Sequence, residues 1–261
     1  MLLPMRTRAA VLREIGRPAP YANSRPLSIE EFELDPPGEG EVLVRVRAAG
    51  LCHSDLSVID GNRPRPVPMV LGHEAAGVVE AIGPGVRGLA PGDHVVAAFV
   101  PSCGHCAPCS GGRPALCEPG FRANSAGTLL SGSRRLHDAT GDVHHHLGVS
   151  GFAEHAVLSA HSLVRVPGDL PLAEAALFGC AVITGVGAVV NTAAMPRGAT
   201  AAVVGLGGVG LAAVLAARML GAREIVAIDL NERKLSVARE FGATATVSAA
   251  SPGCDAAAGA E

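Results

Sequence analysis

Four cysteines that lie close together carry the clearest chemical signal of this chain. They follow the spacing C-x2-C-x2-C-x7-C and make up four of the seven cysteines: Cys103, Cys106, Cys109 and Cys117. The segment around them is rich in glycine and proline and has few apolar residues to bury. Four thiolates at such intervals can close tetrahedrally on one Zn²⁺, which then holds the segment together. The spacing predicts a structural zinc lobe over about residues 101–120. Disulfides and separate surface thiols are the alternatives, but the N-terminus gives no sign of an oxidising compartment.

A second chemical pattern is the glycine-rich stretch Gly205-Leu206-Gly207-Gly208-Val209-Gly210. G-x-G-x-x-G alone is a weak signal in a chain with 33 glycines, but here an apolar strand precedes it and a helix follows. A pyrophosphate can then lie at the helix N-terminus, where backbone N–H groups face it. Asp229 ends the next strand, where its carboxylate would accept hydrogen bonds from a ribose and repel a 2′-phosphate, which favours NAD over NADP. Lys234 is either a second ribose contact or a solvated lysine. A glycine-rich turn without a ligand is the alternative for the whole stretch.

The elements expected to position the cysteine lobe are β-strands. Residues 41–47 alternate apolar and polar side chains with period 2, as a half-buried strand does. Residues 75–82 and 94–99 are further strand candidates, separated by turns rich in glycine and proline. From the cysteine lobe to residue 150 the pattern indicates a long polar loop, of a length that is usually functional or anchored by a metal.

The elements expected to position the glycine-rich stretch alternate between helix and strand. A helical stretch of Ala, Val and Leu covers 172–190 and is interrupted by glycines. A strand over 200–205, a helix to about residue 220, a strand over 224–229 and a helix over 231–241 follow. This alternation predicts a βαβ unit with a parallel sheet and right-handed crossovers.

Length and composition limit the classes of protein to consider. The 261 residues suffice for one large or two ordinary domains. The net charge of −3 arises from mixed acids and bases, which argues against a nucleic-acid partner. We find neither a signal peptide nor an apolar run of membrane-spanning length, so we expect a soluble, cytoplasmic protein without a membrane partner. Aromatic residues total 3% and Trp is absent, which predicts an aliphatic core.

A zinc lobe followed by a dinucleotide fold resembles the zinc-dependent medium-chain alcohol dehydrogenases. The resemblance extends over about residues 8–247 and is closest to the long-loop branch that includes the liver-type and glutathione-dependent formaldehyde dehydrogenases. It is carried by the cysteine lobe, the glycine-rich stretch and residues 50–55, 71–77 and 179–185. It implies an α/β + β fold, with a GroES-like, β-rich catalytic domain over 1–180 that contains the zinc lobe. The N-terminal half of an NAD-binding Rossmann domain, a doubly wound parallel sheet, would follow over 181–261.

The resemblance also implies a second, catalytic zinc, and so two zinc ions per chain. Its ligands would be Cys52, His73 and Cys180, which are too far apart in the sequence for spacing alone to connect them. Two cysteines, one histidine and an open fourth position form the zinc site for which alcohol dehydrogenases are known. Zinc there would lower the pKa of the alcohol hydroxyl, and the alkoxide would pass a hydride to NAD⁺. The implied partner is a small alcohol or aldehyde.

Residues beside these ligands receive roles from the same resemblance. Ser54 would take the hydroxyl proton, Asp55 would orient His73, and Glu74 would lie behind the metal. As isolated residues, Ser54 and Asp55 are more often part of a turn or a helix cap. The remaining assignments are His53 against the pyrophosphate, Thr184 and Val209 beside the nicotinamide, and Phe99 and His146 in the substrate pocket. A histidine in that pocket suits a small polar substrate, whereas His144 and His145 are interpreted as solvated loop residues.

The chain departs from the family pattern in three places. Ser57 stands where liver-type enzymes have a proton-relay histidine, and Phe121 lies near the position of the anion-binding arginine of glutathione-dependent enzymes. Family members also continue well beyond the residue at which this sequence ends. We therefore expect one half of the Rossmann sheet without the second, and without the strand that joins subunits in the homo-oligomeric family. The alternative function is that of a truncated, non-catalytic zinc-binding remnant.

Overall fold

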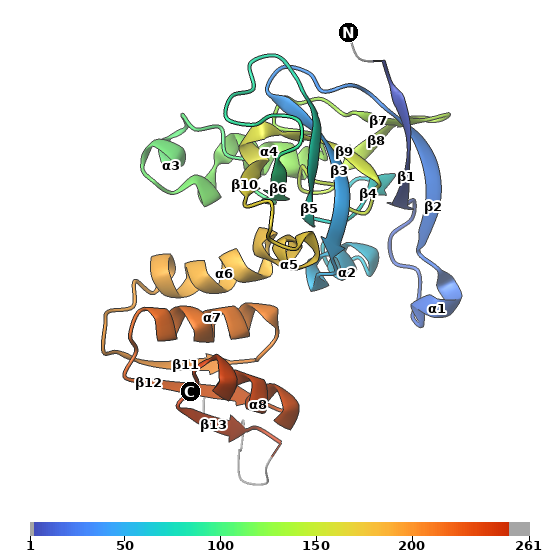
Figure 1. Ribbon diagram of the computed structural model, residues 1–261. Coiled ribbons are helices and arrows are strands. Elements are labelled where there is room, and N and C mark those ends of the chain that lie inside the picture. Colours follow the sequence, from blue (N-terminus) through green and yellow to red (C-terminus); the bar gives the residue numbers. More distant parts are fainter. Residues whose placement is uncertain (1–2, 251–261) are drawn as a thin grey trace. The chain divides into compact units, whose positions relative to one another are not determined.

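The computed structural model describes residues 3–250, and the chain divides into two compact units. The N-terminal unit is Met1–Cys180, and the C-terminal unit is Ala181–Glu261. The N-terminal unit contains a barrel and a five-stranded sheet, whereas the C-terminal unit contains a three-stranded parallel sheet with helices (Figure 1). The predicted order, a β-rich domain followed by an α/β domain, is confirmed.

Five strands of the N-terminal unit close into a barrel in the order β1-β2-β7-β8-β4. They are β1 (Met5–Leu12), β2 (Leu27–Leu34), β4 (Met69–Val70), β7 (Leu136–Asp138) and β8 (Gly141–His145). β1 and β2 pair antiparallel over their whole length, from Met5 opposite Leu34 to Leu12 opposite Leu27. Because side chains alternate across a strand, this register turns Ala9 and Val11 of β1 and Phe32 and Leu34 of β2 toward the interior.

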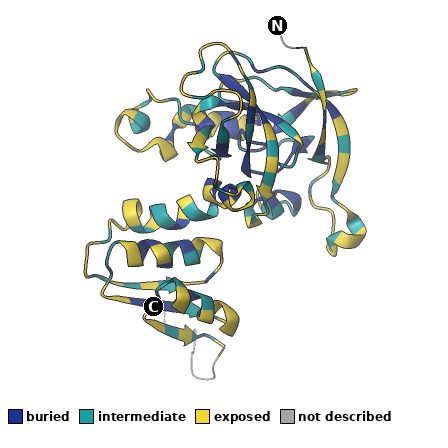
Figure 2. Ribbon diagram, in the orientation of Figure 1, coloured by how far each residue is buried: buried dark blue, intermediate teal, exposed yellow. Residues whose placement is uncertain are grey.

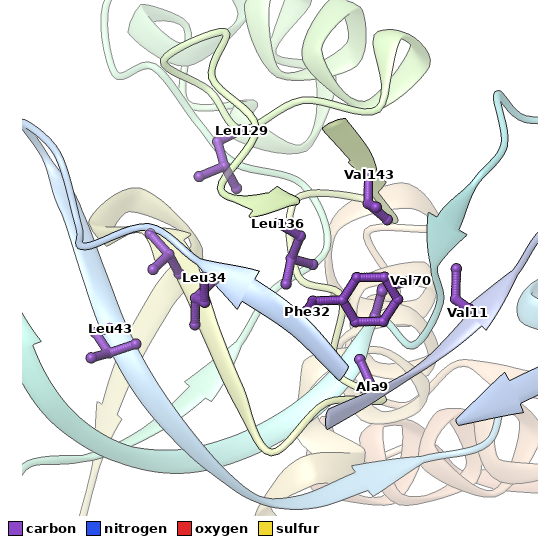
Figure 3. Packing of buried hydrophobic residues seen from close by; sticks show 10 residues of the cluster. Ala9, Val11, Phe32, Leu34, Leu43, Val70, Leu129, Leu136 and Val143 are labelled. Atoms are coloured by element: carbon purple, nitrogen blue, oxygen red, sulfur yellow. The ribbon is translucent and has the colours of Figure 1, made fainter. Parts of the chain in front are cut away.

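The interior of the barrel is filled almost entirely by aliphatic side chains. Phe32 is the one aromatic residue among the buried members of this cluster. Figure 3 shows the cluster as sticks and labels Phe32 together with Ala9, Val11, Leu34, Leu43, Val70, Leu129, Leu136 and Val143. Figure 2 shows the buried residues gathered along the strands of the N-terminal unit. The composition predicts such an aliphatic core, and the structure confirms it.

The second sheet of the N-terminal unit has the order β10-β6-β5-β3-β9. Its strands are β3 (Glu41–Gly50), β5 (Glu74–Ile82), β6 (His94–Ala97), β9 (His155–Ser159) and β10 (Leu163–Val166). The three predicted strands are present, although β6 ends before Phe99. β3 is half-buried only in its second part, because Val42 and Val44 pack in one core cluster while Leu43 packs in the barrel cluster.

The segment that follows the cysteine lobe is not the long polar loop that we predicted. Helix α4 (Glu118–Ala126) occupies its start, and β7 and β8 form a hairpin within it. Local signals for α4 were present: the Cys117 side chain accepts a hydrogen bond from the Gly120 N–H, and Gly127 ends the helix in the left-handed conformation at φ 66°. The strands were missed because each has only three to five residues.

The interpretation of His145 as a solvated loop residue is wrong. Its side chain is fully buried on β8, and its Nε2 accepts a hydrogen bond of 3.0 Å from the Arg135 backbone N–H. Burial lowers the pKa of His145 to about 3, with Arg134 and Arg135 adding to the shift, so the ring is neutral. His144 is half-buried beside Arg134, as expected for a residue on the other face of the same strand.

The C-terminal unit has the predicted βαβ organisation. Its elements are α6 (Ala181–Gly187), β11 (Thr200–Val204), α7 (Gly208–Met219), β12 (Glu224–Asp229), α8 (Glu232–Phe241) and β13 (Ala245–Ser248). The strands run parallel in the order β11-β12-β13. Asn231 caps α8 by accepting the Arg233 N–H, so the helix begins one residue later than predicted. Leu206, Val214, Ile225 and Leu235 are among the buried residues that join helices and sheet.

Short helices make up most of the remaining secondary structure. They are α1 (Tyr21–Ser24), α2 (His53–Ile59), α3 (Ala107–Ser110), α5 (Leu172–Ala175), the 3₁₀ turns Pro114–Leu116, Ala160–Ser162 and Ala176–Gly179, and the π turn Ala188–Thr192. Among the described residues, no single helix has both the length and the apolar composition to cross a membrane. The broken pair 172–179 and 181–192 reaches that threshold only when its two halves are taken together.

Candidate functional site

The four cysteines of the lobe converge on one point. The Sγ atoms of Cys103, Cys106, Cys109 and Cys117 all lie within 4.8 Å of one another. Backbone N–H groups point at these sulfurs: the Cys103 N–H lies 3.2 Å from the Cys117 Sγ, and the Cys106 N–H lies 3.3 Å from the Cys103 Sγ. Such contacts favour thiolates, because an N–H group donates to a negatively charged sulfur.

The electrostatics of the lobe fit a bound cation. Backbone N–H groups of His105 and Cys106 lower the pKa of the Cys103 thiol to about 6. Burial, together with the neighbouring sulfurs, raises the pKa of the Cys109 thiol to about 12. Both burial and neighbouring thiolates disfavour a further negative charge on this sulfur, and a cation bound among the sulfurs would favour it. A tetrad of sulfurs is the donor set that Zn²⁺ prefers in closed structural sites, so the residues fit this metal.

A second group of metal-ligating side chains forms where three neighbouring strands of the N-terminal unit meet. Its ligand atoms lie within 4.8 Å of one another and come from Cys52, His73, Glu74 and Cys180. The pairing of β3 with β5 places Gly50 opposite Glu74, which brings the segment after β3 beside the start of β5. The pairing of β5 with β6 places Ala75 opposite Ala97, and the chain returns against Ala97 just before Cys180. Strand register thus unites ligands that the sequence keeps far apart.

The return of the chain at Cys180 requires a glycine. A Cβ atom at Gly179 would lie 2.3 Å from the carbonyl oxygen of Ala97, so only a residue without a side chain can lie this close to β6. Burial raises the pKa of the Cys180 thiol to about 12, and the nearby Cys52 and Glu74 add to the shift. This partly buried space contains two thiols, an imidazole and a carboxylate, all of which can act as metal ligands. The set of two cysteines and one histidine suits Zn²⁺.

Asp55 connects the segments that carry two of these ligands. Its side chain is buried, and Oδ1 accepts hydrogen bonds from the Gly72 N–H at 3.1 Å and from the His73 Nδ1 at 3.2 Å. Oδ2 accepts the Cys52 N–H at 3.3 Å. Burial alone would raise the pKa of Asp55, but the contacts with His146 and His73 hold it well below its usual range. The ionised carboxylate keeps the proton of His73 on Nδ1 and leaves Nε2 free for a metal.

Phe99 and His146, which we predicted to line a substrate pocket, both lie against His73. The ring of Phe99 meets that of His73 at 84° with centroids 5.7 Å apart, and the ring of His146 meets it at 88° and 5.5 Å. His146 is buried, with Nδ1 3.1 Å from the Asp55 Oδ1. Its contact with Asp55 was not foreseen, because no sequence pattern connects residues so far apart.

The first turn of α2 holds the other residues expected near the metal. Ser54 is half-buried in this turn, and His53 is exposed at the first helical position. Ser57, which stands at the position of the relay histidine, donates its hydroxyl to the His53 carbonyl at 3.0 Å. The Ser57 hydroxyl is thus engaged with the backbone of its own helix. His53 belongs to the N-terminal unit and the glycine-rich stretch to the C-terminal unit, so its cofactor role stays a prediction.

The glycine-rich stretch of the C-terminal unit forms the turn between β11 and α7. Gly205 has φ +87°, a left-handed conformation that favours glycine. A Cβ at Gly210 would lie 1.9 Å from the Gly205 carbonyl oxygen, so the helix packs directly on the turn. A Cβ at Gly207 would meet no atom within 4 Å and would fill the open space in front of the helix N-terminus. This open cradle of backbone N–H groups fits a dinucleotide pyrophosphate.

Asp229 lies at the end of β12 and supports the glycine-rich turn. Its Oδ2 accepts the Leu206 N–H at 2.7 Å and its Oδ1 accepts the Asn231 N–H at 2.9 Å. These hydrogen bonds hold the pKa of Asp229 below its ordinary value. The Lys234 ammonium lies 3.6 Å from the Asp229 Oδ2. Thr184 and Val209, the predicted nicotinamide neighbours, are exposed on α6 and α7.

Two family models match this chain. The alcohol dehydrogenase GroES-like domain covers residues 38–168, and the zinc-binding dehydrogenase model covers residues 208–259. The first contains Cys52, His73 and the cysteine lobe, and the second begins at the start of α7.

Relatives of known sequence or structure resemble most of the chain. "Putative alcohol dehydrogenase D" of Mycobacterium tuberculosis is 44% identical over 92% of this chain, which spans 63% of that relative's length. An alcohol dehydrogenase zinc-binding domain protein from Burkholderia ambifaria matches 95% of this chain and 65% of its own, with 43% identity and a TM-score of 0.86. Benzyl alcohol dehydrogenase from Acinetobacter calcoaceticus gives the same coverages, with 35% identity and a TM-score of 0.84. Other matching structures were solved with NAD or with NADP.

Proposed function

Because the chain belongs to the zinc-binding medium-chain dehydrogenase family, we propose that it transfers a hydride between a primary alcohol, or a hydroxymethyl-thiol adduct, and NAD⁺. The observation that carries this proposal is the convergence of Cys52, His73 and Cys180 within 4.8 Å. The cysteine lobe would hold a second, structural zinc. We further propose that the chain belongs to the long-loop branch of the family, which the lobe and the segment after it resemble.

Side chains of the N-terminal unit would prepare the alcohol for oxidation. A Zn²⁺ held by Cys52, His73 and Cys180 would supply a Lewis acid that lowers the pKa of the alcohol hydroxyl. Ser54, half-buried in the first turn of α2, would accept the proton that this hydroxyl releases and pass its own proton on to the cofactor ribose. Asp55 keeps the Nδ1 proton of His73 in place, so that the imidazole presents its Nε2 lone pair.

The C-terminal unit would bind the adenosine half of the cofactor. The open space at Gly207 leaves room for the pyrophosphate at the N-terminus of α7, whose N–H groups attract negative charge. The Asp229 carboxylate would accept hydrogen bonds from the ribose hydroxyls and repel a 2′-phosphate, which favours NAD. Lys234 offsets part of that charge, but its side chain is solvent-accessible and the ion pair is weak.

The proposal is tested with the purified chain loaded with zinc. We expect about two zinc ions per chain and NADH formation that depends on a primary alcohol, with benzyl alcohol included in the panel because one matched relative acts on it. Cys180→Ser should remove one zinc and the activity, while an exchange of the exposed His161 to Asn should change neither. Two bound zinc ions without any turnover would favour the non-catalytic alternative, and fewer than two in the unaltered chain would contradict the ligand assignment.

A further inference from the structure

We refer to Cys52, His73, Glu74 and Cys180 as the catalytic cluster. His146 is a buried histidine that contacts His73 of this cluster without belonging to it. Its side chain is 2% exposed, and Nδ1 lies 3.1 Å from the Asp55 Oδ1. This contact has ion-pair distance but lacks the alignment of a hydrogen bond, and Nδ1 has no other partner among the described residues. Buried nitrogens of this kind normally have a hydrogen-bond partner, because an unpaired one loses its hydration without compensation. The placement of His146 therefore calls for a function.

The Asp55 carboxylate is shared between His73 and His146. Its Oδ1 already accepts the Gly72 N–H and the His73 Nδ1, and the His146 Nδ1 approaches the same oxygen. The rings of the two histidines meet nearly at right angles, at 88°. A rotation of the carboxylate away from His146 would alter the direction of its bond to His73. The orientation of the His73 ring thus depends on the position of the Asp55 carboxylate, and that position depends in turn on His146.

His146 is more deeply buried than a residue that lines an open substrate pocket would be. Its Nδ1, the nitrogen that faces the Asp55 carboxylate, can carry an N–H donor. An N–H group at Nδ1, 3.1 Å from the Asp55 Oδ1, can hold the carboxylate in position and leave its negative charge available to His73. An apolar ring at this position would preserve the packing against His73 and would lose the polar contact.

We propose that His146 is a positioning residue for the catalytic zinc ligand His73, acting through the Asp55 carboxylate. This inference rests on the part of the proposed function that assigns the catalytic zinc to Cys52, His73 and Cys180. A group hydrogen-bonded directly to a metal ligand, as Asp55 is to His73, typically contributes 10- to 100-fold in metal affinity, and His146 acts on that group. His146→Phe should therefore weaken zinc binding at this site about 10-fold or more.

Two substitutions of His146 distinguish the contribution of its ring from that of its N–H donor. His146→Phe keeps a ring beside His73 and removes the nitrogen, whereas His146→Asn removes the ring and can place an amide N–H near the position of Nδ1. Zinc affinity is measured in the full chain by competition with a chromogenic chelator, and the class of site lost in Cys180→Ser identifies the catalytic one. The visible spectrum of the Co²⁺-substituted chain reports ligand geometry independently of turnover.

We expect His146→Phe to weaken the catalytic class about 10-fold and to shift its cobalt bands, and His146→Asn to restore most of the affinity. His144→Asn, an exchange on the same strand beside Arg134, should behave as the unaltered chain. If His146→Phe does not fold, His146→Gln takes its place. The Gln side chain is longer than that of Asn, so its amide lies beyond the position of Nδ1 and the donor near Asp55 is again lost.

Three outcomes would overturn the inference. The first is unchanged affinity and an unchanged cobalt spectrum in His146→Phe. The second is an equal loss in His146→Phe and His146→Asn. The third is a loss that extends to the cysteine lobe together with a lower unfolding midpoint, which would mean general destabilisation. Failure of the unaltered chain to bind zinc at Cys180 would instead contradict the proposed function, so the two failures are distinguishable.

Discussion

The two groups of cysteines in the N-terminal unit are assembled in opposite ways. In the lobe, all four thiols come from one short segment, Cys103 to Cys117, and three of the four are only half-buried. In the catalytic cluster, the ligands are spread from Cys52 to Cys180, and strands β3, β5 and β6 bring them together. With zinc bound as we propose, the lobe would depend on the metal for its shape, whereas the catalytic cluster depends on the sheet.

Chain entropy supports this contrast. Closing the loop between Cys52 and Cys180 costs about 2 kcal/mol more than closing the loop between Cys103 and Cys117. In the catalytic cluster, the sheet and its buried aliphatic residues offset this cost before any metal binds. The lobe has little such burial, so metal–thiolate bonds would supply its order under the proposed function. We expect the two sites to respond separately to substitution.

The largest effect is expected from His73→Ala. Loss of this ligand removes the Lewis acid, and the rate of alcohol-dependent NADH formation should fall about 1,000-fold or more. Steady-state kinetics and zinc content check the prediction, with one zinc ion per chain expected to remain in the lobe. Loss of both zinc ions would show that the two sites are not independent.

Cys106→Ser should give the reverse pattern. The exchange removes one thiolate of the lobe, and we expect the free energy of unfolding to fall by about 2 kcal/mol, or the melting temperature by about 4–8 °C. The catalytic zinc should stay bound, because β3, β5 and β6 hold its ligands. Thermal unfolding monitored with zinc content tests this, and a simultaneous release of both metals would contradict the contrast.

Asp55→Asn should act on the catalytic cluster alone. It preserves the shape of the side chain but removes the charge that holds His73, so zinc affinity at this cluster should fall about 10- to 100-fold. Chelator competition measures the change, and the affinity of the cysteine lobe is the internal control. An equal loss in the lobe would mean that the exchange disrupts the whole unit.

The smallest effect is expected from His105→Ala. This residue is exposed in the cysteine lobe, and its Nδ1 lies 2.8 Å from the Cys103 carbonyl oxygen. We expect a change in the free energy of unfolding below about 0.5 kcal/mol, because exposed contacts of this kind contribute little. The free energies of unfolding of His105→Ala and Cys106→Ser are compared by denaturant titration. An equally large loss in both variants would show that local hydrogen bonds, not thiolates, order the lobe.

Much of the fold was predictable because its signals are local. The alternation over 41–47 predicted β3, and the strand–glycine–helix order predicted β11, α7 and β12. The short strands β7 and β8 were missed, since their few residues carry too little periodicity to identify. His145 was misplaced for the same reason, because only the closed barrel shows which face of β8 is buried.

The candidate site, too, has parts that local sequence signals predict and parts that only the folded structure reveals. The spacing of the cysteines and glycines was sufficient to predict that the lobe and the turn at Gly207 could each bind a ligand. The convergence of Cys52, His73 and Cys180 came only from a family resemblance, because strand register determines it. The approach of His146 to Asp55 came from neither, since it requires the folded positions of β8 and α2.

The close approach of Gly179 to Ala97 has a consequence for how this chain tolerates sequence drift. Because Ala97 pairs with both β5 and β10, its carbonyl group has no room to retreat from an added methyl group. Every other amino acid at position 179 would therefore displace Cys180 without altering it. Selection for a functional site should thus restrict a residue that has no reactive atom as tightly as the cysteine that follows it.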